Sequence, residues 1–424
     1  MSKNALYLPI LLAASVGFAC GGGQHTDVDA TPDRPDGALL LADAGEPAPD
    51  ATPTDATPPD TMPAPDAPPM ASACGQPDSW RPMSQADAPS GRYWQGAVWT
   101  GTEVMIWGGV ADNGYQNTGA LYNPSTDTWR PVTPAGAPSG RLDMVMAWTG
   151  TEVLVWGGRA GGGSGYQDGA RYNPATDTWT PMSTVSAPPP TAEPQGVWTG
   201  TELIVWGDDT TAGARYHPGL DSWTMMSQVG APTPRDRYVM VWGDGELMVW
   251  GGRACGGGMC PYVDTGARYD PVADSWTATS TQAAPTGASW SSGVWTGNEF
   301  IVFGGRTCGT VQGCEVNDSG RYSPMTDTWT ALTTAGAPSP RHNHTGVWTG
   351  DRMLIWGGGG SMLDTGALYD PTADTWTATT QVDAPSGRRL HTGIWTDAGL
   401  IIWGGTTEAD NTASDGAVYC PARR

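Results

Sequence analysis

The chain is poor in positive charge: its only lysine is Lys3, and the formal net charge at pH 7 is −22 over 424 residues. Binding to DNA or RNA needs clustered lysine and arginine to neutralise phosphates, so this balance argues against a nucleic-acid partner. Phenylalanine is scarce, with 3 residues, and no long amphipathic helical pattern is present. By contrast there are 22 Trp, 60 Gly and 37 Pro. Many tryptophans between glycine and proline turns favour an all-β fold of short strands.

The first 19 residues have the features of a signal peptide. Lys3 is followed by a mostly apolar run, and Gly17-Phe18-Ala19 precedes Cys20. The run is too short for a membrane span. Small residues before a cysteine resemble the lipobox of bacterial lipoproteins, which implies cleavage before Cys20 and lipidation of that residue. The alternative is an ordinary signal peptide, cleaved without lipidation. We expect an extracytoplasmic protein, either a bacterial outer-membrane or cell-surface lipoprotein or a secreted protein.

Residues 20–73 form a segment of different composition, rich in Pro, Ala, Thr and Asp. It carries ten acidic residues against a single arginine, Arg34. Such a segment cannot bury enough apolar surface to fold. We therefore predict a disordered, extended linker over residues 20–73, which holds a folded domain of residues 74–424 away from a surface.

Four aromatic signatures recur in the rest of the chain, each seven times. A tryptophan ends a short strand, usually before Thr-Gly, at Trp99, Trp148, Trp198, Trp242, Trp295, Trp348 and Trp395. An apolar run then reaches Trp-Gly-Gly or a variant at Trp107, Trp156, Trp206, Trp250, Phe303, Trp356 and Trp403. A Gly-Ala-x-Tyr type strand ends at Tyr122, Tyr172, Tyr216, Tyr269, Tyr322, Tyr369 and Tyr419. The last signature, Asp-Thr/Ser-Trp, ends at Trp80, Trp129, Trp179, Trp223, Trp276, Trp329 and Trp376.

The repeat length identifies the kind of fold. Trp107 and Trp403 are separated by 296 residues over six intervals, or about 49 per repeat. This is close to the period of Kelch repeats, and residues 76–420 resemble the Kelch family in the order of the apolar-Gly-Gly, Tyr and Trp positions. The resemblance implies a seven-bladed β-propeller of four-stranded antiparallel blades. In the first blade we expect strands a to d at residues 92–99, 103–107, 119–122 and 127–131, and the aromatic residues in the blade core.

The signatures also predict how the ring closes. Trp80 belongs to a d strand but comes before any a strand, and the seventh repeat ends at Tyr419 without a d strand. The N-terminal strand should therefore complete the last blade. Cys74 and Cys420 both fall at the position of the missing turn between strands c and d, which predicts a disulfide across the closure.

The remaining cysteines of the folded part form two local pairs. These are Cys255 with Cys260 and Cys308 with Cys314, each in a loop after a b strand. Cys20 is left over, as a lipoprotein requires. A metal site is the alternative use of these cysteines, but no Cys-x-x-Cys and no adjacent histidine is present. We expect no metal and no cofactor.

The loops differ between the two faces of the expected propeller. The turns from a to b and from c to d, on what we call the turn face, are short and uniform, whereas the b-to-c loops on the opposite loop face vary. Variable loops on a rigid scaffold usually carry function. Arginine precedes the strand-end tryptophan by seven residues in five blades, at Arg92, Arg141, Arg235, Arg341 and Arg388. We consider two roles for these arginines: hydrogen bonds to loop carbonyls between blades, or a cationic mouth for carboxylates.

Five residues before the same tryptophan the side chains differ from blade to blade. They are Trp94, Asp143, Glu193, Arg237, Trp290, Asn343 and Leu390. Aromatic rings mixed with carboxylate, amide and guanidinium groups suit a sugar, and packing between blades is the alternative. If the linker joins at Cys74, on the turn face, these residues point away from the anchoring membrane.

Catalysis is the less favoured interpretation. Galactose oxidase and sialic acid epimerases are enzymes that resemble this propeller, but the oxidase needs copper ligands from histidine and tyrosine, and only five histidines are present. His344 and His391 occupy equivalent places in adjacent blades, where a core role and a ligand-binding role are both open. No nucleophile with a base stands out. We expect a binding scaffold for a protein or glycan ligand, with a glycan-active enzyme and a purely structural surface protein as alternatives.

Overall fold

The computed structural model describes residues 76–161, 165–208, 210–254, 260–308 and 313–422. They belong to one compact unit, Pro63–Arg424. The expected signal peptide and most of the expected linker, including Cys20, lie outside the described residues. In the described part every regular element is a strand, and no helix there is long and apolar enough to cross a membrane.

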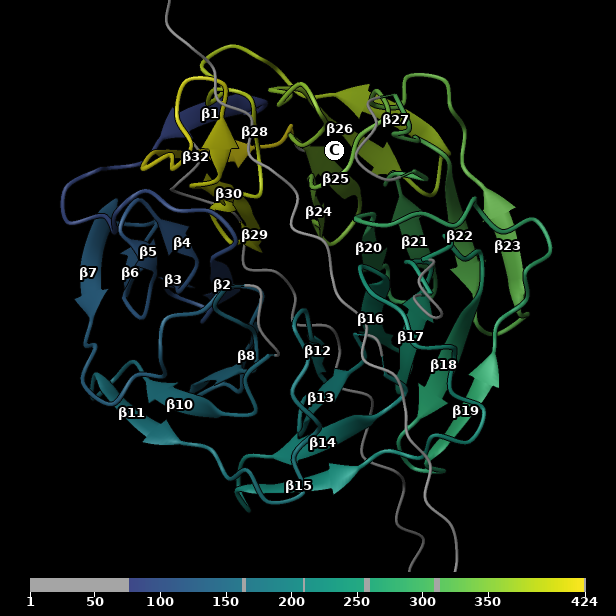
Figure 1. The fold of residues 1–424 in the computed structure, drawn as a ribbon. Helices are drawn as coiled ribbons and strands as arrows, with labels where there is room; N and C mark the ends of the chain where they lie inside the picture. The colour runs from purple at the N-terminus through teal and green to yellow at the C-terminus, as the bar shows by residue number, and fades with distance from the viewer. Residues whose placement is uncertain (1–75, 162–164, 209, 255–259, 309–312, 423–424) are drawn as a thin grey trace, which may run out of the picture. The chain divides into compact units, whose positions relative to one another are not determined.

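The strands form seven four-stranded antiparallel sheets arranged around a central axis (Figure 1), so the seven-bladed β-propeller predicted from the sequence is confirmed. Blade 1 comprises β2 (Gly96–Trp99), β3 (Val104–Trp107), β6 (Gly119–Asn123) and β7 (Thr128–Val132). Blade 2 comprises β8 (Val145–Trp148), β9 (Val153–Trp156), β10 (Gly169–Asn173) and β11 (Thr178–Pro181). Blade 3 comprises β12 (Gln195–Trp198), β13 (Leu203–Trp206), β14 (Gly213–His217) and β15 (Ser222–Met225). Blade 4 comprises β16 (Val239–Gly243), β17 (Glu246–Trp250), β18 (Gly266–Asp270) and β19 (Ser275–Ala278).

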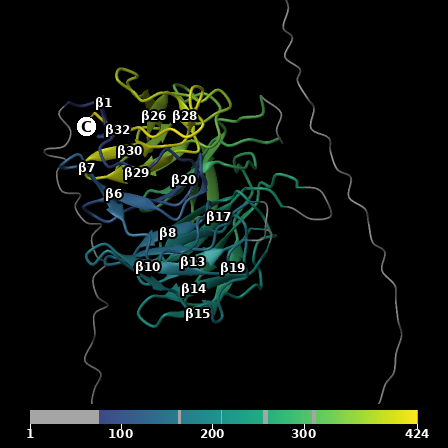
Figure 2. The ribbon, with the colours of Figure 1, turned by 60° about the vertical axis from the view of Figure 1, so that its left-hand side comes forward.

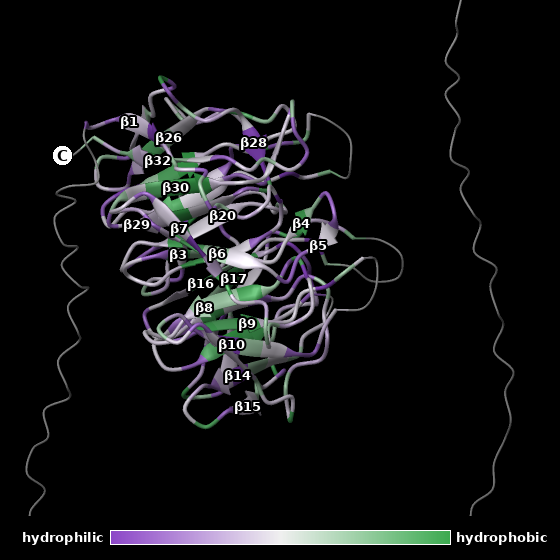
Figure 3. Ribbon diagram, turned by 90° about the vertical axis from the view of Figure 1, so that its left-hand side faces the viewer, coloured by the Kyte–Doolittle hydropathy of each residue, from purple (hydrophilic) through white to green (hydrophobic). Residues whose placement is uncertain are grey.

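The remaining three blades follow the same order. Blade 5 comprises β20 (Ser292–Trp295), β21 (Phe300–Phe303), β22 (Ser319–Ser323) and β23 (Thr328–Ala331). Blade 6 comprises β24 (Thr345–Trp348), β25 (Met353–Trp356), β26 (Gly366–Asp370) and β27 (Thr375–Ala378). Blade 7 comprises β29 (Thr392–Thr396), β30 (Gly399–Trp403), β32 (Gly416–Cys420) and the N-terminal β1 (Ser79–Pro82). Two short pairs, β4 (Val110–Ala111) with β5 (Gly114–Tyr115) and β28 (Arg388–Arg389) with β31 (Thr406–Thr407), lie at the loop face, on the right in Figure 3.

Blade 7 closes the ring with the first and the last strand of the propeller, as the sequence predicts. β1 pairs with β32, with Trp80 opposite Tyr419, and the two strands lie side by side in Figures 1 and 2. The Trp80 ring also packs 5.3 Å from the Trp356 ring of blade 6. The closure is therefore continuous with the packing of the other blades.

The core lies between neighbouring blades rather than within single ones. The aromatic residue that ends the second strand of one blade packs on the last-strand tryptophan of the next: Trp107 and Trp179, for example, have ring centroids 5.5 Å apart. Within a blade, Tyr172 packs 5.0 Å from Trp179. These rings are almost fully buried, and stretches of the ribbon coloured as hydrophobic in Figure 3 lie in strands such as β9 and β30. Burial of such rings is the main source of stability in this ring of sheets.

The Asp-Thr/Ser-Trp turns do more than end a hairpin, because each one joins two blades. In blade 1 the Tyr122 hydroxyl donates to Asp127 Oδ1 at 2.6 Å, and the same oxygen accepts the backbone N–H of Ser84, which follows β1, at 2.9 Å. The indole of Trp129 donates to the Ser84 carbonyl at 2.8 Å. The equivalent three bonds recur at every junction of the ring, including the closure, where the carboxylate is that of Asp78.

The first strand of blade 1 is shorter than predicted. We expected it to begin at residue 92, whereas β2 begins at Gly96. Trp94 adopts a φ of +53°, which interrupts an extended strand, and Tyr93 instead pairs with Val110 in the following loop. Five further blades have a positive φ at the equivalent residue, so this bend is part of the repeat and aims the side chain into the ring.

The glycine pairs that follow the second strands also help to fix the geometry of the loop face. Gly109 has a φ of +85°, and a Cβ there would meet the Tyr93 carbonyl oxygen at 2.8 Å. Its N–H donates to the Arg141 carbonyl of blade 2 at 2.8 Å. Only glycine fits this crossing, which fixes one blade against the next at the loop face.

Candidate functional site

The seven residues that differ between blades come together around the axis of the propeller. They line one cavity of about 400 Å³ at the loop-face end of the channel, and we call them the mouth ring: Trp94, Asp143, Glu193, Arg237, Trp290, Asn343 and Leu390. Their backbones are linked across blades, since Trp94 N–H donates to the Leu390 carbonyl at 3.2 Å and Trp290 N–H to the Arg237 carbonyl at 3.2 Å. A ring of backbone thus presents seven side chains, of six types, to one cavity.

One side of the mouth ring is a connected network of charges. Arg159 lies 2.9 Å from Asp143 Oδ2 and 3.0 Å from Glu193 Oε1. Glu193 in turn contacts Arg237 at 3.2 Å. The side chains of these four residues are only about a fifth exposed. Since each carboxylate has an arginine partner, blades 2 to 4 present acidic and basic side chains in alternation.

Asp143 has an unusual acidity within this network. Burial, together with the neighbouring Glu193 carboxylate, raises the pKa of Asp143 from 3.8 to about 7. Arg159 and Arg237 oppose this shift but do not cancel it. The charge of the mouth therefore changes near neutral pH.

The two tryptophans of the mouth ring have different surroundings. The Trp290 ring is covered by the guanidinium of Arg237, whose Cζ lies 4.2 Å from the ring centroid, and Arg253 and Arg306 lie 6.0 and 5.9 Å away. Such contacts hold the indole by cation–π attraction. Trp94 is 38% exposed and is the freer ring, with Tyr93 packed 5.2 Å from it. Trp94 is thus the more exposed aromatic surface of the mouth ring.

The five arginines expected as a possible cationic mouth are instead buried braces. Arg92, Arg141, Arg235, Arg341 and Arg388 are each at most 1% exposed. Arg92 donates to the carbonyls of Ser90, Gly108 and Thr118 at 2.9, 3.0 and 2.7 Å, and the other four repeat this pattern. Their donors are used up, so they cannot contact a ligand. The arginines therefore have the first of the two expected roles, hydrogen bonding to loop carbonyls. However, these carbonyls belong to the arginine's own blade and not to a neighbouring blade.

These braces hold the mouth ring in place. Each arginine lies two residues before a mouth-ring residue and ties it to the ends of strands b and c. Burial lowers the pKa of Arg92, Arg235 and Arg341 to about 10, so they stay charged at neutral pH. Fully used guanidinium donors in a buried site fix the loop geometry.

His344 and His391 border the mouth cavity but join blades to each other. His344 Nε2 lies 2.8 Å from Ser292 Oγ of blade 5, and His391 Nε2 lies 2.8 Å from Thr345 Oγ1 of blade 6. Burial lowers the pKa of His391 to about 3 and holds that of His344 well below its usual value. Both histidines are neutral in the folded protein at physiological pH. Among the described residues no group of three His, Cys, Asp or Glu side chains could hold a metal ion.

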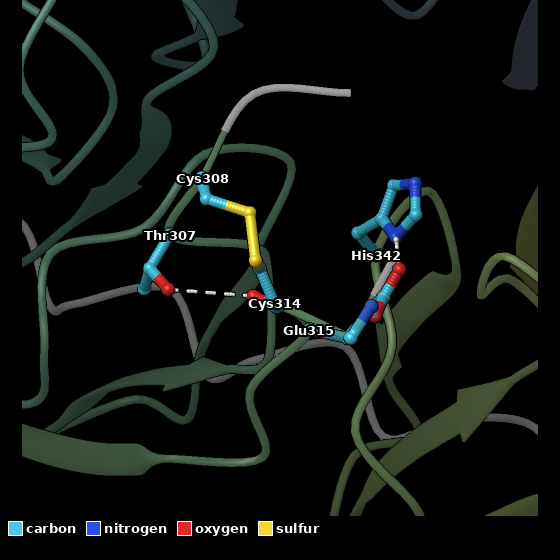
Figure 4. Close-up of a disulfide and its surroundings, with 6 residues drawn as sticks. Thr307, Cys308, Cys314, Glu315 and His342 are labelled. Carbon is cyan, nitrogen blue, oxygen red and sulfur yellow. Dashed lines mark hydrogen bonds and ion pairs between the residues drawn. A yellow bond between two sulfur atoms is a disulfide. The ribbon is translucent and has the colours of Figure 1, made fainter. Parts of the chain in front are cut away.

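A disulfide follows Arg306, whose guanidinium lies 5.9 Å from the Trp290 ring. Cys308 and Cys314 are bonded, with an S–S distance of 1.90 Å, as the sequence predicts (Figure 4). The residue after Cys314, Glu315, turns toward His342 of blade 6, with Oε1 3.5 Å from Nδ1. Burial lowers the pKa of His342 to about 4, and Arg306 adds to this shift. The disulfide loop therefore reaches across a blade junction at the edge of the mouth.

The other expected disulfides involve cysteines that are only partly described. Cys260 and Cys420 are disulfide-bonded. Their expected partners, Cys255 and Cys74, lie outside the described residues. The two pairings remain predictions.

Three arginines near the mouth ring were not predicted from the sequence. Arg159, Arg253 and Arg306 directly follow the Gly-Gly of the second strands of blades 2, 4 and 5. There they pair, as isolated bridges, with Leu142, Asp236 and Ser289. The recurrence of Gly-Gly-Arg at one position was visible in the sequence, and it places a cation beside the mouth ring in each case.

A seven-bladed propeller with a ring of differing side chains around one cavity suggests a scaffold for protein interaction. The chain belongs to the Kelch-repeat family: the model of the KLHDC2/KLHL20/DRC7 Kelch-repeats domain matches residues 76–218 and 214–405. Kelch propellers generally bind proteins. No curated protein matches the chain in sequence.

Proposed function

We propose that this protein is an extracytoplasmic, lipid-anchored interaction scaffold that binds a partner protein over the mouth ring. The observation that carries the proposal is that the seven positions at which the blades differ line one cavity, while the turns of the opposite face repeat almost unchanged. Specific recognition needs differing side chains on a fixed frame, and the braces and blade junctions supply that frame.

The mouth ring contains a few large side chains of the kinds that dominate binding energy in protein interfaces. Trp94 offers an exposed ring, and Arg237 and Trp290 form a stacked pair. Tryptophan and arginine dominate the binding energy of protein interfaces. The paired charges of Asp143, Glu193 and Arg159 would select partners by electrostatic complementarity.

The test is capture of partners by the compact unit Pro63–Arg424 from an extract of its own cell envelope and surroundings, followed by affinity measurement for each captured protein. We expect Trp94→Ala and Trp290→Ala each to weaken binding about fivefold or more, which corresponds to roughly 1 kcal/mol. Ser125→Ala, in a turn on the opposite face, is the control and should leave the affinity unchanged. If Ser125→Ala abolishes binding while both tryptophan variants bind normally, the working face is the other one.

A glycan ligand is the second candidate for the same site. Trp94 is 38% exposed, and the Asn343 amide lines the same cavity. An indole face with a neighbouring amide suits the apolar C–H face and the hydroxyls of a sugar ring. A glycan array probed with the same three variants distinguishes this candidate: binding of a glycan that both tryptophan variants lose, without any captured protein, would favour it.

A further inference from the structure

The turn face carries two cavities at equivalent blade junctions. One, of about 390 Å³, lies between blades 2 and 3 and is lined by Trp198, Arg171, Glu152, Thr149, Thr151 and Pro218. The other, of about 480 Å³, lies between blades 5 and 6 and is lined by Trp348, Arg321, Glu299, Thr296, Asn298 and Pro371. Trp, Arg, Glu, Thr and Pro thus recur at the same places, whereas Thr151 and Thr201 of the first cavity correspond to Asn298 and Asp351 of the second. His217 also lines the first cavity, and the Asp351 carboxylate of the second lies 3.4 Å from Arg352. We call them the 2/3 cleft and the 5/6 cleft.

Each cleft has a paired charge in its wall. Arg171 Nη1 lies 3.6 Å from Glu152 Oε2 and donates to the Pro218 carbonyl of blade 3 at 3.1 Å. In the 5/6 cleft the corresponding distances, from Arg321, are 3.7 Å to Glu299 and 2.9 Å to the Pro371 carbonyl. Since each arginine faces a carboxylate, this wall offers strong hydrogen-bonding groups of both kinds without a net charge.

The other wall of each cleft is an indole. Trp198 and Trp348 end the first strands of blades 3 and 6, and both are partly buried against the core clusters at their junctions. Hydroxyl and amide groups stand on the rim, at Thr149 and Thr151 in one cleft and at Thr296 and Asn298 in the other. An apolar ring, a neutral Arg–Glu pair and rim hydroxyls are thus within one small space.

We propose that these clefts bind neutral saccharides. A pyranose ring has a C–H face that packs on an indole and hydroxyls that both donate and accept, which matches the two walls. An anion would gain little, because the carboxylate already neutralises the arginine. The cavity volumes lie within the range of small-molecule sites. This proposal does not depend on a ligand at the mouth ring, which lies at the other end of the channel.

The repeat gives the proposed sites a further property. Two or more equivalent clefts on one rigid ring can bind several sugars of one polymer or surface at once. Binding to the second site then becomes effectively intramolecular, so a weak affinity for a single sugar becomes a strong one for a polysaccharide.

The test reports on each cleft separately. The full-length mature protein is labelled with 5-fluorotryptophan, and the resonances of Trp198 and Trp348 are assigned with Trp198→Phe and Trp348→Phe. The probes are the methyl glycosides of glucose, galactose and mannose, and N-acetylglucosamine. We expect at least one of these sugars to shift both resonances, in a saturable way.

Two rim variants are designed to block one cleft each without touching the core. Thr151 and Asn298 are exposed, so Thr151→Arg and Asn298→Arg should fold normally. Thr151→Arg should abolish the sugar-induced shift of Trp198 and leave that of Trp348, and Asn298→Arg should do the reverse. Thr281→Arg, at an exposed position in a loop of the opposite face, is the matched control and should preserve both shifts.

Three results would overturn the proposal. One is that no sugar of the panel shifts either resonance. Another is that the shifts persist in both rim variants. The third is that the sugar shifts only the resonances of Trp94 and Trp290, which would place the saccharide at the mouth. Loss of partner binding in Trp94→Ala, by contrast, concerns only the function proposed above, because that variant leaves both clefts intact.

Discussion

The hydroxyl of Tyr419 donates to Oδ1 of Asp78 at 2.6 Å, although 341 positions separate the two residues in the chain. The same oxygen accepts the backbone N–H of Thr380 in blade 6 at 3.1 Å. One carboxylate therefore joins the segment before β1 to β32, the last strand of the propeller, and to the neighbouring blade. It is the closing member of a set of seven equivalent junctions.

This junction predicts a specific effect of Asp78→Ala. Loss of two hydrogen bonds to a carboxylate should cost about 1–3 kcal/mol, and β1 should detach before the rest of the ring unfolds. Limited proteolysis and hydrogen exchange at residues 79–82 measure the detachment. Asp177→Ala, which removes the same contacts to Tyr172 and Thr133 within a continuous stretch of blades, should lose similar stability without freeing β1. Equal protection of β1 in both variants would contradict the role of Asp78 in closure.

The disulfide framework is a second prediction. Mapping of non-reduced peptides should find Cys74 linked to Cys420, Cys255 to Cys260 and Cys308 to Cys314. The first of these bonds closes the longest loop, and the chain-entropy model assigns it up to about 5 kcal/mol. The double variant Cys74→Ser, Cys420→Ser should therefore melt at a lower temperature, with blade 7 opening first. Any other connectivity of Cys74 would show that the ring is not closed covalently at this turn.

The buried arginines predict a loss of stability rather than of binding. Arg341→Lys keeps the charge but cannot reach the carbonyls of Ser339, Gly357 and Thr365 together, so we expect a loss of about 2–4 kcal/mol. Thermal unfolding measures this. Arg130→Lys is the control, since Arg130 is 40% exposed and pairs with Glu103, and should change stability by about 0.5 kcal/mol or less. An unchanged melting temperature for Arg341→Lys would mean that these hydrogen bonds contribute little to stability.

Asp143 predicts a pH dependence of stability. Because its pKa is raised to about 7 in the folded protein, the folded state binds the proton more tightly than the unfolded state, whose aspartate has a pKa near 3.8. This residue therefore lowers stability above pH 7, and its cost is relieved as the pH falls toward 4. Asp143→Asn should raise the melting temperature at pH 8 but not at pH 4, with a gain of at most about 4 kcal/mol. A lower melting temperature of this variant at pH 8 would mean that the ion pair with Arg159 outweighs burial.

The proposed anchor is tested on Cys20. Mass spectrometry of the mature N-terminus should find Cys20 as the first residue, carrying a diacyl or triacyl group. Cys20→Ser should release the protein from the membrane fraction without changing its thermal unfolding. An unmodified terminus at another residue would leave an ordinary secreted protein.

The architecture was predictable because its signals are periodic and local. Trp99, Trp107, Tyr122 and Trp129 each mark the end or middle of a strand, and the copies that follow repeat their order. Even the closure could be inferred, because Trp80 stands alone before the first complete repeat. Aromatic burial decides this fold, and aromatic residues are visible in a sequence.

The roles of charged side chains were harder to predict, because their partners leave no trace in the sequence. Arg92 lies in a loop, which suggests exposure, but its side chain is buried and donates to backbone carbonyls. Every residue has such a carbonyl, so the sequence does not mark these partners. Asp127 falls at the start of the predicted d strand of blade 1, and its second partner, Ser84, belongs to another blade. The recurrence of that aspartate in all seven turns was the available clue. The mouth ring could be predicted because its residues differ between repeats that are otherwise alike, and such differences are visible in the sequence.

The shared carboxylate of Asp78 also has a consequence for biosynthesis. β1 is made first, yet its partner β32 is made last, so an unpaired strand edge persists until almost the whole chain has been synthesised. Contacts between such distant segments form slowly, and exposed strand edges invite aggregation. An exported chain of this design would depend on translocation finishing before the ring closes. Pauses late in synthesis or export should therefore be more damaging to its yield than pauses early on.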